Sequence, residues 1–297
     1  MDIRDKMKKY GKQFLTQTAK YSKHKTIIDV QKQFSPQVEI PQKSVMEQPQ
    51  NEQKHQLPPK TDYNKKFIET FRKLTYTRRS LDIWSDFVTM FACSISNAID
   101  KKNYDKREEL YLRCIDKYNE QERMLFPELA AIVVTALDEN PEQDFLGHLY
   151  MNLGLGSKST SQFFTPYHIC QLMSEMTVGN ISEEIKKNGY VSINDPCCGA
   201  GATLVAAINT VKKQLEKENL NFQNHLLIVA QDIDFTVAAM CYIQISLLGA
   251  AGYVKVGNSL TEPICENDTD ENYWFTPMYF SEIWQTRMTL KKMKTLF

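Results

Sequence analysis

Glycine is almost absent from the first half of this sequence. Of 11 glycines, only Gly11 comes before Gly147. Because glycine supplies many of the tight turns between strands, its scarcity argues against a turn-rich sheet there and favours helices. Long apolar runs are also missing, since the longest, residues 129–137, contains Thr135 and is well short of the roughly 20 residues that cross a bilayer. Residues 1–6 lack the apolar stretch of a secretion signal, so neither a membrane span nor export is expected.

Paired cysteines are missing as well. The seven cysteines form no C-x-x-C motif, and only Cys197 and Cys198 are adjacent. The five histidines show no metal-ligand spacing, so neither a disulfide framework nor a metal site is expected. This use of cysteine favours a reducing, cytoplasmic location.

The chain carries no net charge, but its charges are unevenly distributed. Residues 1–60 carry 12 basic and 6 acidic side chains. Residues 61–157 carry 13 basic and 16 acidic side chains, and residues 158–297 carry 11 basic and 14 acidic ones. Residues 31–60 also hold eight glutamines and five of the eleven prolines, which is typical of a poorly ordered linker. We therefore expect residues 1–64 to be a disordered basic arm and linker. The arm could contact nucleic acid phosphates, although its lack of interleaved aromatic residues favours a solvated tail.

Hydrophobic periodicity divides the rest of the chain. Apolar residues recur at helical spacing from about Phe67 to Leu153, which predicts a helical domain over residues 65–157. Farther on, Thr165 and Pro166 have the character of a helix N-cap and first helical residue, and Gly189 that of a helix end. Strand-like runs then alternate with helical ones, which predicts an α/β fold with parallel βαβ units over residues 158–297. The expected strands are 191–194, 226–230 and 253–256, and the expected helices are 202–218 and 235–248.

Polar or glycine-rich segments follow each expected strand. Residues 195–201 (DPCCGAG) follow the first strand, Asp232 ends the second, and Asn258 follows the third. Since ligands bind at the carboxyl ends of strands in open α/β sheets, the three segments together predict a nucleoside-type ligand site. Asp232 is the better ligand candidate than Asp234, which could instead cap the next helix. The glycine spacing fits neither G-x-G-x-x-G nor the phosphate-binding P-loop, which argues against a nucleotide-dependent oxidoreductase.

Two of these segments resemble motifs of one family. QFFTP at residues 162–166, followed by DPCCGAG at residues 195–201, is similar to the motif pair of S-adenosylmethionine-dependent adenine-N6 DNA methyltransferases. The resemblance is greatest to modification subunits of type I restriction systems and to related phage or mobile-element enzymes. It implies a Rossmann-like methyltransferase domain at residues 158–297, after the helical domain. Residues 145–150 also resemble the end of that family's helical domain.

The resemblance assigns cofactor-binding roles by position. The QFFTP segment would pack over the methionine part of S-adenosylmethionine, and the glycine loop would hold its amino acid portion. An acid at the end of the second strand would bind the ribose, and the residue after the third strand would lie near the adenine. The residues concerned are Gln162, Phe163, Phe164, Thr165, Pro166, Asp195, Pro196, Gly199, Ala200, Gly201, Asp232 and Asn258.

The sequence departs from this family at the catalytic motif. Family members carry N-P-P-Y or N-P-P-F, which holds the flipped adenine, and no N-P-P occurs in this chain. No catalytic residue is therefore assigned, although the aromatic residues of segment 273–280 could offer stacking surfaces. The 103 residues from Asp195 to Phe297 would be short for a seven-stranded sheet with a target-recognition domain.

Two hypotheses follow. The chain is an adenine-N6 DNA methyltransferase of a restriction-modification type, or it is a catalytically impaired subunit that binds the cofactor and acts through protein or DNA partners. DNA and a specificity or modification subunit are the expected partners. The two small Cys197 and Cys198 side chains are expected to pack beneath the loop rather than to act as nucleophiles.

Overall fold

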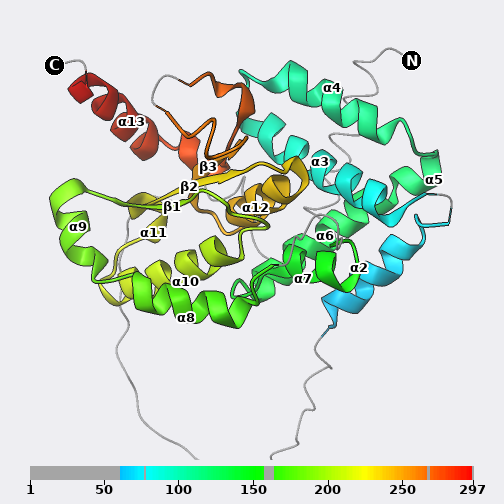
Figure 1. Ribbon diagram of the computed structural model, residues 1–297, viewed down its shortest axis with the longest axis horizontal. Coiled ribbons are helices and arrows are strands. Elements are labelled where there is room, and N and C mark those ends of the chain that lie inside the picture. The colour runs from blue at the N-terminus through cyan, green and yellow to red at the C-terminus, as the bar shows by residue number, and fades with distance from the viewer. Residues whose placement is uncertain (1–60, 77, 157–163, 266–267, 296–297) are drawn as a thin grey trace, which may run out of the picture.

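The computed structural model describes residues 61–76, 78–156, 164–265 and 268–295. Helices surround a small sheet, and the helices of the N-terminal part of the chain form a group beside it, on the right in Figure 1. The basic arm expected over residues 1–64 lies almost wholly outside the described residues. Its last four residues, 61–64, are described, and disorder was the wrong expectation for them, because the first described helix begins at Tyr63 with the Asp62 side chain accepting a hydrogen bond from the Lys65 amide.

The N-terminal part is helical, as its lack of glycine predicted. Its longest helix is apolar along most of its length and is buried on several sides. The helices are α2 (Tyr63–Arg72), α3 (Ser80–Ile99), α4 (Tyr104–Ile115), α5 (Glu120–Arg123), α6 (Leu125–Glu139) and α7 (Phe145–Asn152).

The C-terminal part alternates strands and helices, which confirms the expected α/β fold class. The three expected strands are present, each extended by one or two residues. The elements are α8 (Tyr167–Thr177), α9 (Ile181–Asn188), β1 (Val191–Asp195), α10 (Ala202–Lys217), α11 (Phe222–His225), β2 (Leu226–Asp232), α12 (Phe235–Leu247), β3 (Ala251–Val256), β4 (Tyr273–Phe275) and α13 (Glu282–Thr295), with short 3₁₀ turns η2 (Asp270–Asn272) and η3 (Pro277–Phe280).

The sheet has the order β1-β2-β3-β4. The first three strands are parallel, with Asp195 opposite Ala230 and Asp232 opposite Val256. The fourth strand, which periodicity did not reveal, pairs with β3 in the antiparallel sense. Within the described residues, β1 therefore has a neighbouring strand on one side only.

Each face of the sheet is covered by helices. Alternate β2 residues such as Ile228 and Ala230 belong to the main hydrophobic core on the side of α10 and α12. Leu227 points to the opposite face, where Trp284 of α13 is fully buried against it. The sheet is thus sandwiched between α13 on one side and α10 with α12 on the other (Figure 1).

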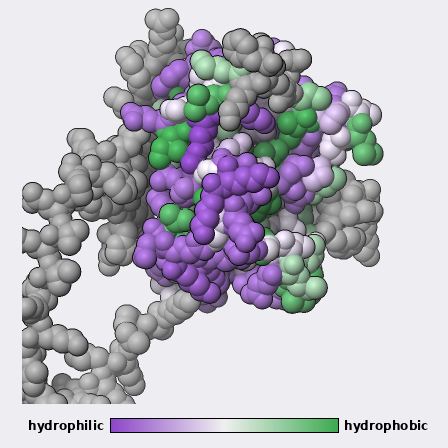
Figure 2. Space-filling view, turned by 90° about the vertical axis from the view of Figure 1, so that its left-hand side faces the viewer, coloured by the Kyte–Doolittle hydropathy of each residue, from purple (hydrophilic) through white to green (hydrophobic). Residues whose placement is uncertain are grey.

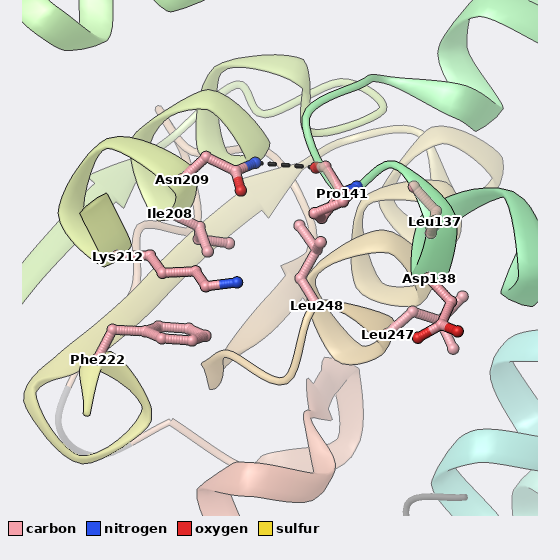
Figure 3. A pocket seen from close by; sticks show the side chains of 9 residues that line it. All are labelled: Leu137, Asp138, Pro141, Ile208, Asn209, Lys212, Phe222, Leu247 and Leu248. Carbon is pink, nitrogen blue, oxygen red and sulfur yellow. Dashed lines mark hydrogen bonds between the residues drawn. The ribbon is translucent and has the colours of Figure 1, made fainter. Parts of the chain in front are cut away.

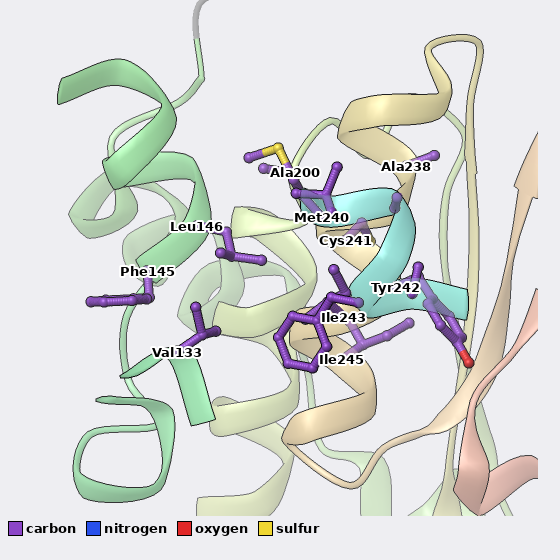
Figure 4. Packing of buried hydrophobic residues seen from close by; sticks show 14 of the residues in the cluster. Val133, Phe145, Leu146, Ala200, Ala238, Met240, Cys241, Tyr242, Ile243 and Ile245 are labelled. Atoms are coloured by element: carbon purple, nitrogen blue, oxygen red, sulfur yellow. The ribbon is translucent and has the colours of Figure 1, made fainter. Parts of the chain in front are cut away.

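The main core is continuous between the helical and α/β parts. It runs from aromatic side chains of α2 and α3 through α7 to α12 and the inner face of the sheet. Figure 4 shows Leu146 of α7 pointing toward α12, where Ile243 is fully buried. The indole N–H of Trp84 on α3 also donates to the Met240 sulfur on α12 over 3.4 Å. The two parts are therefore packed together through a shared hydrophobic interior.

Local chemistry explains several helix ends. The Asp234 carboxylate accepts hydrogen bonds from the Thr236 and Val237 amides, which confirms it as the cap of α12. Gly189 ends α9 in the left-handed conformation, also as expected. The expected cap at Thr165 was wrong, because Pro166 is the N-cap of α8 and Tyr167 its first residue. The pattern nevertheless located the start of the helix to within one residue. Proline at the N-cap fixes the backbone where the chain enters the helix.

The surface that includes α9 is mainly hydrophilic. Glu183, Glu184, Lys186 and Lys187 all lie on the exposed side of that helix, and hydrophilic residues predominate in the view of Figure 2. Among the described helices, none combines the length and the apolar character needed to cross a membrane.

Candidate functional site

The ends of β1 and β2 are joined by hydrogen bonds through the glycine loop. The Cys198 amide donates to the Gln231 carbonyl over 3.0 Å, and the Gly199 amide donates to Asp232 Oδ2 over 2.8 Å. Asp232 Oδ1 also accepts from the Asp234 amide over 3.0 Å. The carboxylate expected to bind a ribose thus also fixes the position of the loop.

The end of β3 joins the same edge. The Gly257 amide donates to the Asp232 carbonyl over 2.9 Å, and the buried Gln231 side chain donates to the Gly257 carbonyl over 3.2 Å. Cys197 Sγ lies 3.8 Å from the Ser259 hydroxyl. The structure therefore brings together all three segments that the sequence placed at the carboxyl ends of the strands.

The glycine loop needs backbone conformations that other residues rarely adopt. Gly199 has φ +52° and Gly201 has φ +93°. A side-chain carbon at Gly201 would also lie 2.9 Å from the Cys241 sulfur of α12. Glycine is therefore required at position 201 for both its dihedral angle and its lack of a side chain.

Asp195 lies at the mouth of the loop. Its Oδ1 accepts from the Cys197 amide over 3.1 Å, and its Oδ2 accepts from the Thr203 hydroxyl over 2.5 Å. The residue is half-buried, next to the exposed Pro196. A carboxylate oxygen can accept more than one hydrogen bond, so Asp195 keeps capacity for a ligand amine.

The expected adenine-side residue, Asn258, begins a turn after β3. Its Oδ1 accepts from the Leu260 amide over 2.9 Å and from the Thr261 amide over 3.4 Å. The residue is half-buried on the same edge as Asp232. The structure thus places it beside the other predicted residues, with its amide nitrogen still able to donate.

The QFFTP segment is only partly described. Gln162 and Phe163 lie outside the described residues, whereas Thr165 and Pro166 are exposed before α8. The Phe164 ring lies over Gly199, 3.5 Å from the point that a side-chain carbon there would occupy. Its centroid is 5.4 Å from that of Tyr150 on α7. This places at least one residue of the segment directly on the glycine loop.

Several residues at this edge were not predicted. Thr203 orients Asp195, and Gln231 ties β2 to the turn after β3. Ile233 is 68% exposed and Leu260 is 91% exposed, beside Asp232 and Asn258 in sequence. A sequence signal was available for Ile233 and Leu260, because each is apolar in an otherwise polar segment at a strand end. Large apolar side chains exposed at a binding edge can be covered by an apolar part of a ligand.

The two adjacent cysteines have different environments. Cys197 is exposed, whereas Cys198 is buried. A hydrogen bond with Cys241, followed by burial, raises the pKa of the Cys198 thiol well above its usual range. Cys198 therefore stays protonated at neutral pH and packs beneath the loop, as expected. The same expectation was wrong for Cys197, whose side chain is exposed.

A cavity lies at the opposite end of the sheet. It is lined by α6, α10, α11 and α12 residues, with the Asn209 amide donating to the Pro141 carbonyl over 2.9 Å at its rim (Figure 3). Phe222, which lines it, precedes β2 rather than following it, and none of the predicted cofactor residues is among its lining residues. Among the described residues, no group of three or more His, Cys, Asp or Glu side chains is arranged to hold a metal ion.

The aromatic segment 273–280 lies at the opposite edge of the sheet from β1. It forms β4 and η3, so β2 and β3 separate it from the glycine loop. Its rings pack on one another, as between Phe275 and Tyr279, whose centroids are 4.8 Å apart. Trp274 turns to the core, beneath the Arg107 guanidinium at 4.4 Å. These rings are engaged in packing at the sheet margin.

Comparison with known proteins gives one family match. The family described as N-6 DNA Methylase matches residues 142–295, which is more than half of the 297 residues. A crystal structure described as a class I S-adenosylmethionine-dependent methyltransferase from Listeria monocytogenes is similar at 12% identity, with a TM-score of 0.36, covering 77% of this chain and 79% of that chain. Because a TM-score of 0.36 is too low to support a structural argument, the family assignment rests on the family match alone. No curated protein matches the chain.

Proposed function

Because the chain belongs to the N-6 DNA methylase family, we propose that it transfers a methyl group from S-adenosylmethionine to N6 of adenine in DNA. S-adenosylmethionine is the cofactor, and methyl transfer is the chemistry of the family. The single observation that best supports this function is the meeting of the glycine loop, Asp232 and the turn at Asn258 at one edge of the sheet.

The residues at this edge fit the cofactor chemically. S-adenosylmethionine carries positive charge on its ammonium and sulfonium groups, and the edge presents the carboxylates of Asp195 and Asp232. Both carboxylates already accept protein hydrogen bonds, which fixes their orientation before a ligand arrives. Gly199 and Gly201 give the loop its tight turn through their positive φ, while Phe164 and Cys241 lie close to where their side chains would be.

We assign roles to the described residues on this basis. Asp232 accepts hydrogen bonds from the ribose hydroxyls, Asp195 and the loop backbone hold the amino acid portion, and Asn258 donates to the adenine. Phe164 covers the methionine side of the loop, and Ile233 and Leu260 cover apolar parts of the adenosine. Gln162 and Phe163 complete the cover in this proposal, together with Thr165 and Pro166.

The methyl group needs little activation by the protein. A bound sulfonium supplies an already activated methyl group, so positioning the target amine in line with it is the main requirement. Extruding the adenine from the duplex is also required, because N6 is shielded within the stack. The family uses an Asn-Pro-Pro motif for this step, and the chain contains none.

A second function is favoured by that missing motif. The chain would bind S-adenosylmethionine without transferring its methyl group, as a modification-like subunit that acts through protein or DNA partners. In either function we propose a cytoplasmic protein of restriction-modification type, with a specificity or modification subunit as partner. The net negative charge of residues 61–297 means that contact with DNA would depend on the basic residues 1–60, on local patches or on that partner.

Two measurements separate these functions. Titration calorimetry with S-adenosylmethionine tests binding, and incubation of the full chain with adenine-containing DNA and methyl-labelled cofactor tests transfer. Methyl label at adenine N6 supports the first function. Binding with no label in DNA, with candidate partner subunits also present, contradicts it and supports the second. Absence of cofactor binding contradicts both.

A further inference from the structure

A buried polar network lies directly beneath the glycine loop. Gln244 of α12 is fully buried, and its Nε2 donates to Asp144 Oδ1 over 2.8 Å and to the Ala200 carbonyl over 2.9 Å. Its Oε1 accepts from the Leu146 amide over 3.2 Å. Every polar atom of this side chain is therefore used, and one amide connects the helical part of the molecule with the cofactor loop.

Asp144 completes the network from the helical side. It is the N-cap of α7, and Oδ1 accepts from the Gly147 amide over 3.0 Å as well as from Gln244. Only 6% of its surface is exposed, and burial is the main cause of its raised pKa. A buried carboxylate is costly unless it is hydrogen-bonded, so this pair has to keep its geometry as a unit.

The carbonyl that accepts from Gln244 belongs to the residue between the two glycines of the loop. Ala200 lies between Gly199 and Gly201, both at positive φ, and glycine has the broadest conformational freedom of any residue. A loop built on two glycines would be expected to sample several conformations. A hydrogen bond from a fixed, buried amide to the carbonyl between them selects one.

Helix α7, which Asp144 caps, also contacts the loop through aromatic side chains. Its Tyr150 packs on Phe164, whose ring lies over Gly199. Tyr150 in turn packs against Trp84 of α3, at 5.8 Å between ring centroids. The loop thus contacts an aromatic stack at Gly199 and the Gln244 amide at Ala200, and α7 contributes to both contacts.

We propose that Asp144 and Gln244 are positioning residues for S-adenosylmethionine, which act through the Ala200 carbonyl to hold the glycine loop in its binding conformation. The inference rests on this loop being the cofactor site. The helical part would then serve binding as well as stability, because displacement of α7 would release the loop.

The test compares two α12 variants in the full chain. Gln244→Leu removes all three hydrogen bonds with little change in volume. The control Tyr242→Phe removes another hydrogen bond from the same helix, that from Tyr242 to the Phe275 carbonyl, which lies away from the loop. We measure the dissociation constant for S-adenosylmethionine by calorimetry, the melting temperature, and hydrogen exchange of the loop amides without cofactor.

Gln244→Leu is expected to weaken cofactor binding about tenfold or more and to speed loop exchange by a similar factor. Tyr242→Phe is expected to leave both within about twofold. Unchanged binding in Gln244→Leu, or weakening in both variants that follows the melting temperature, would overturn the proposal. If the unmodified chain does not bind the cofactor, the cofactor site itself has failed, and loop exchange still decides whether Gln244 holds the loop.

A pair of Asp144 variants keeps the test available if Gln244→Leu does not fold. Asp144→Asn retains an oxygen that can accept from Gln244 and Gly147, and Asp144→Ala retains none. Asn is expected to restore binding to within about threefold of the unmodified chain, whereas Ala loses about tenfold. Equal loss in the two variants at equal stability would contradict a positioning role through hydrogen bonding.

Discussion

The two ends of β2 are built differently. At its amino end, apolar residues of α11 and α12 close around the strand, and the nearby cavity is lined by side chains with no relation to the predicted site. At its carboxyl end, Gln231 and Asp232 bind three separate backbone segments and leave Ile233 largely exposed. One end contributes to the core, and the other holds the polar groups and loops of the proposed cofactor site in place. Substitutions in the interior should therefore affect unfolding, whereas substitutions at the carboxyl edge should affect binding.

The largest expected effect is on the interior. Trp84 is fully buried and touches α2, α7 and α12. Trp84→Ala should lower the free energy of unfolding by about 3–5 kcal/mol, because it leaves a large cavity. Denaturant unfolding measures this, with the exposed Tyr76→Ala as control, since Tyr76 is 87% exposed. A loss below about 1 kcal/mol would mean that the shared interior is not what stabilises the fold.

The next largest effect is expected at the glycine loop. Gly201→Ala combines an unfavourable φ with a contact of 2.9 Å to the Cys241 sulfur, and it should weaken S-adenosylmethionine binding about a hundredfold. Gly154→Ala is the matched control, because Gly154 also has positive φ but has open space around it. Calorimetric titration should find binding to the control nearly unchanged. If Gly154→Ala weakened cofactor binding as much as Gly201→Ala, the loss would reflect general backbone strain and would not identify this loop as the binding site.

A smaller effect on binding is expected at the end of β2. Asp232→Asn removes the negative charge and one acceptor, which should weaken cofactor binding about tenfold. Asp234→Ala should behave in the opposite way, losing about 1 kcal/mol of stability with the cap of α12 while keeping its affinity. Stability and affinity measured on the same samples check the contrast. Reversed outcomes would assign the ligand to Asp234 instead.

The smallest effect concerns pH. Hydrogen bonds from Lys255 and then Tyr273 lower the pKa of Asp268 to about 2. A carboxyl with a depressed folded-state pKa stabilises the fold above its unfolded value, about 4, and loses that contribution as pH falls toward 2. Asp268→Asn should therefore lower the melting temperature slightly at pH 7 and leave it unchanged near pH 2. A difference that persists at pH 2 would point to packing instead of charge.

The sequence was sufficient for the elements with strong local signals. Parallel strands 1 to 3, the helices between them and the edge shared by Asp195, Asp232 and Asn258 follow from periodicity and from the direction of parallel strands. Strand β4 was missed because it has three residues and depends on pairing with β3. The Asp144–Gln244 contact was missed because the two residues are 100 positions apart and each looks unremarkable within its own segment. Local patterns carry no record of such long-range packing.

Gly147, the second glycine of the chain, has a consequence for how relatives of this protein can diverge. A side-chain carbon there would overlap the Asp144 carboxylate, which Gln244 and the Gly147 amide hold in place. A larger residue at position 147 therefore meets a steric penalty that replacement of Asp144 by a smaller residue could relieve. The two positions should covary among homologues, with larger residues at 147 appearing only where the acid at 144 has been replaced.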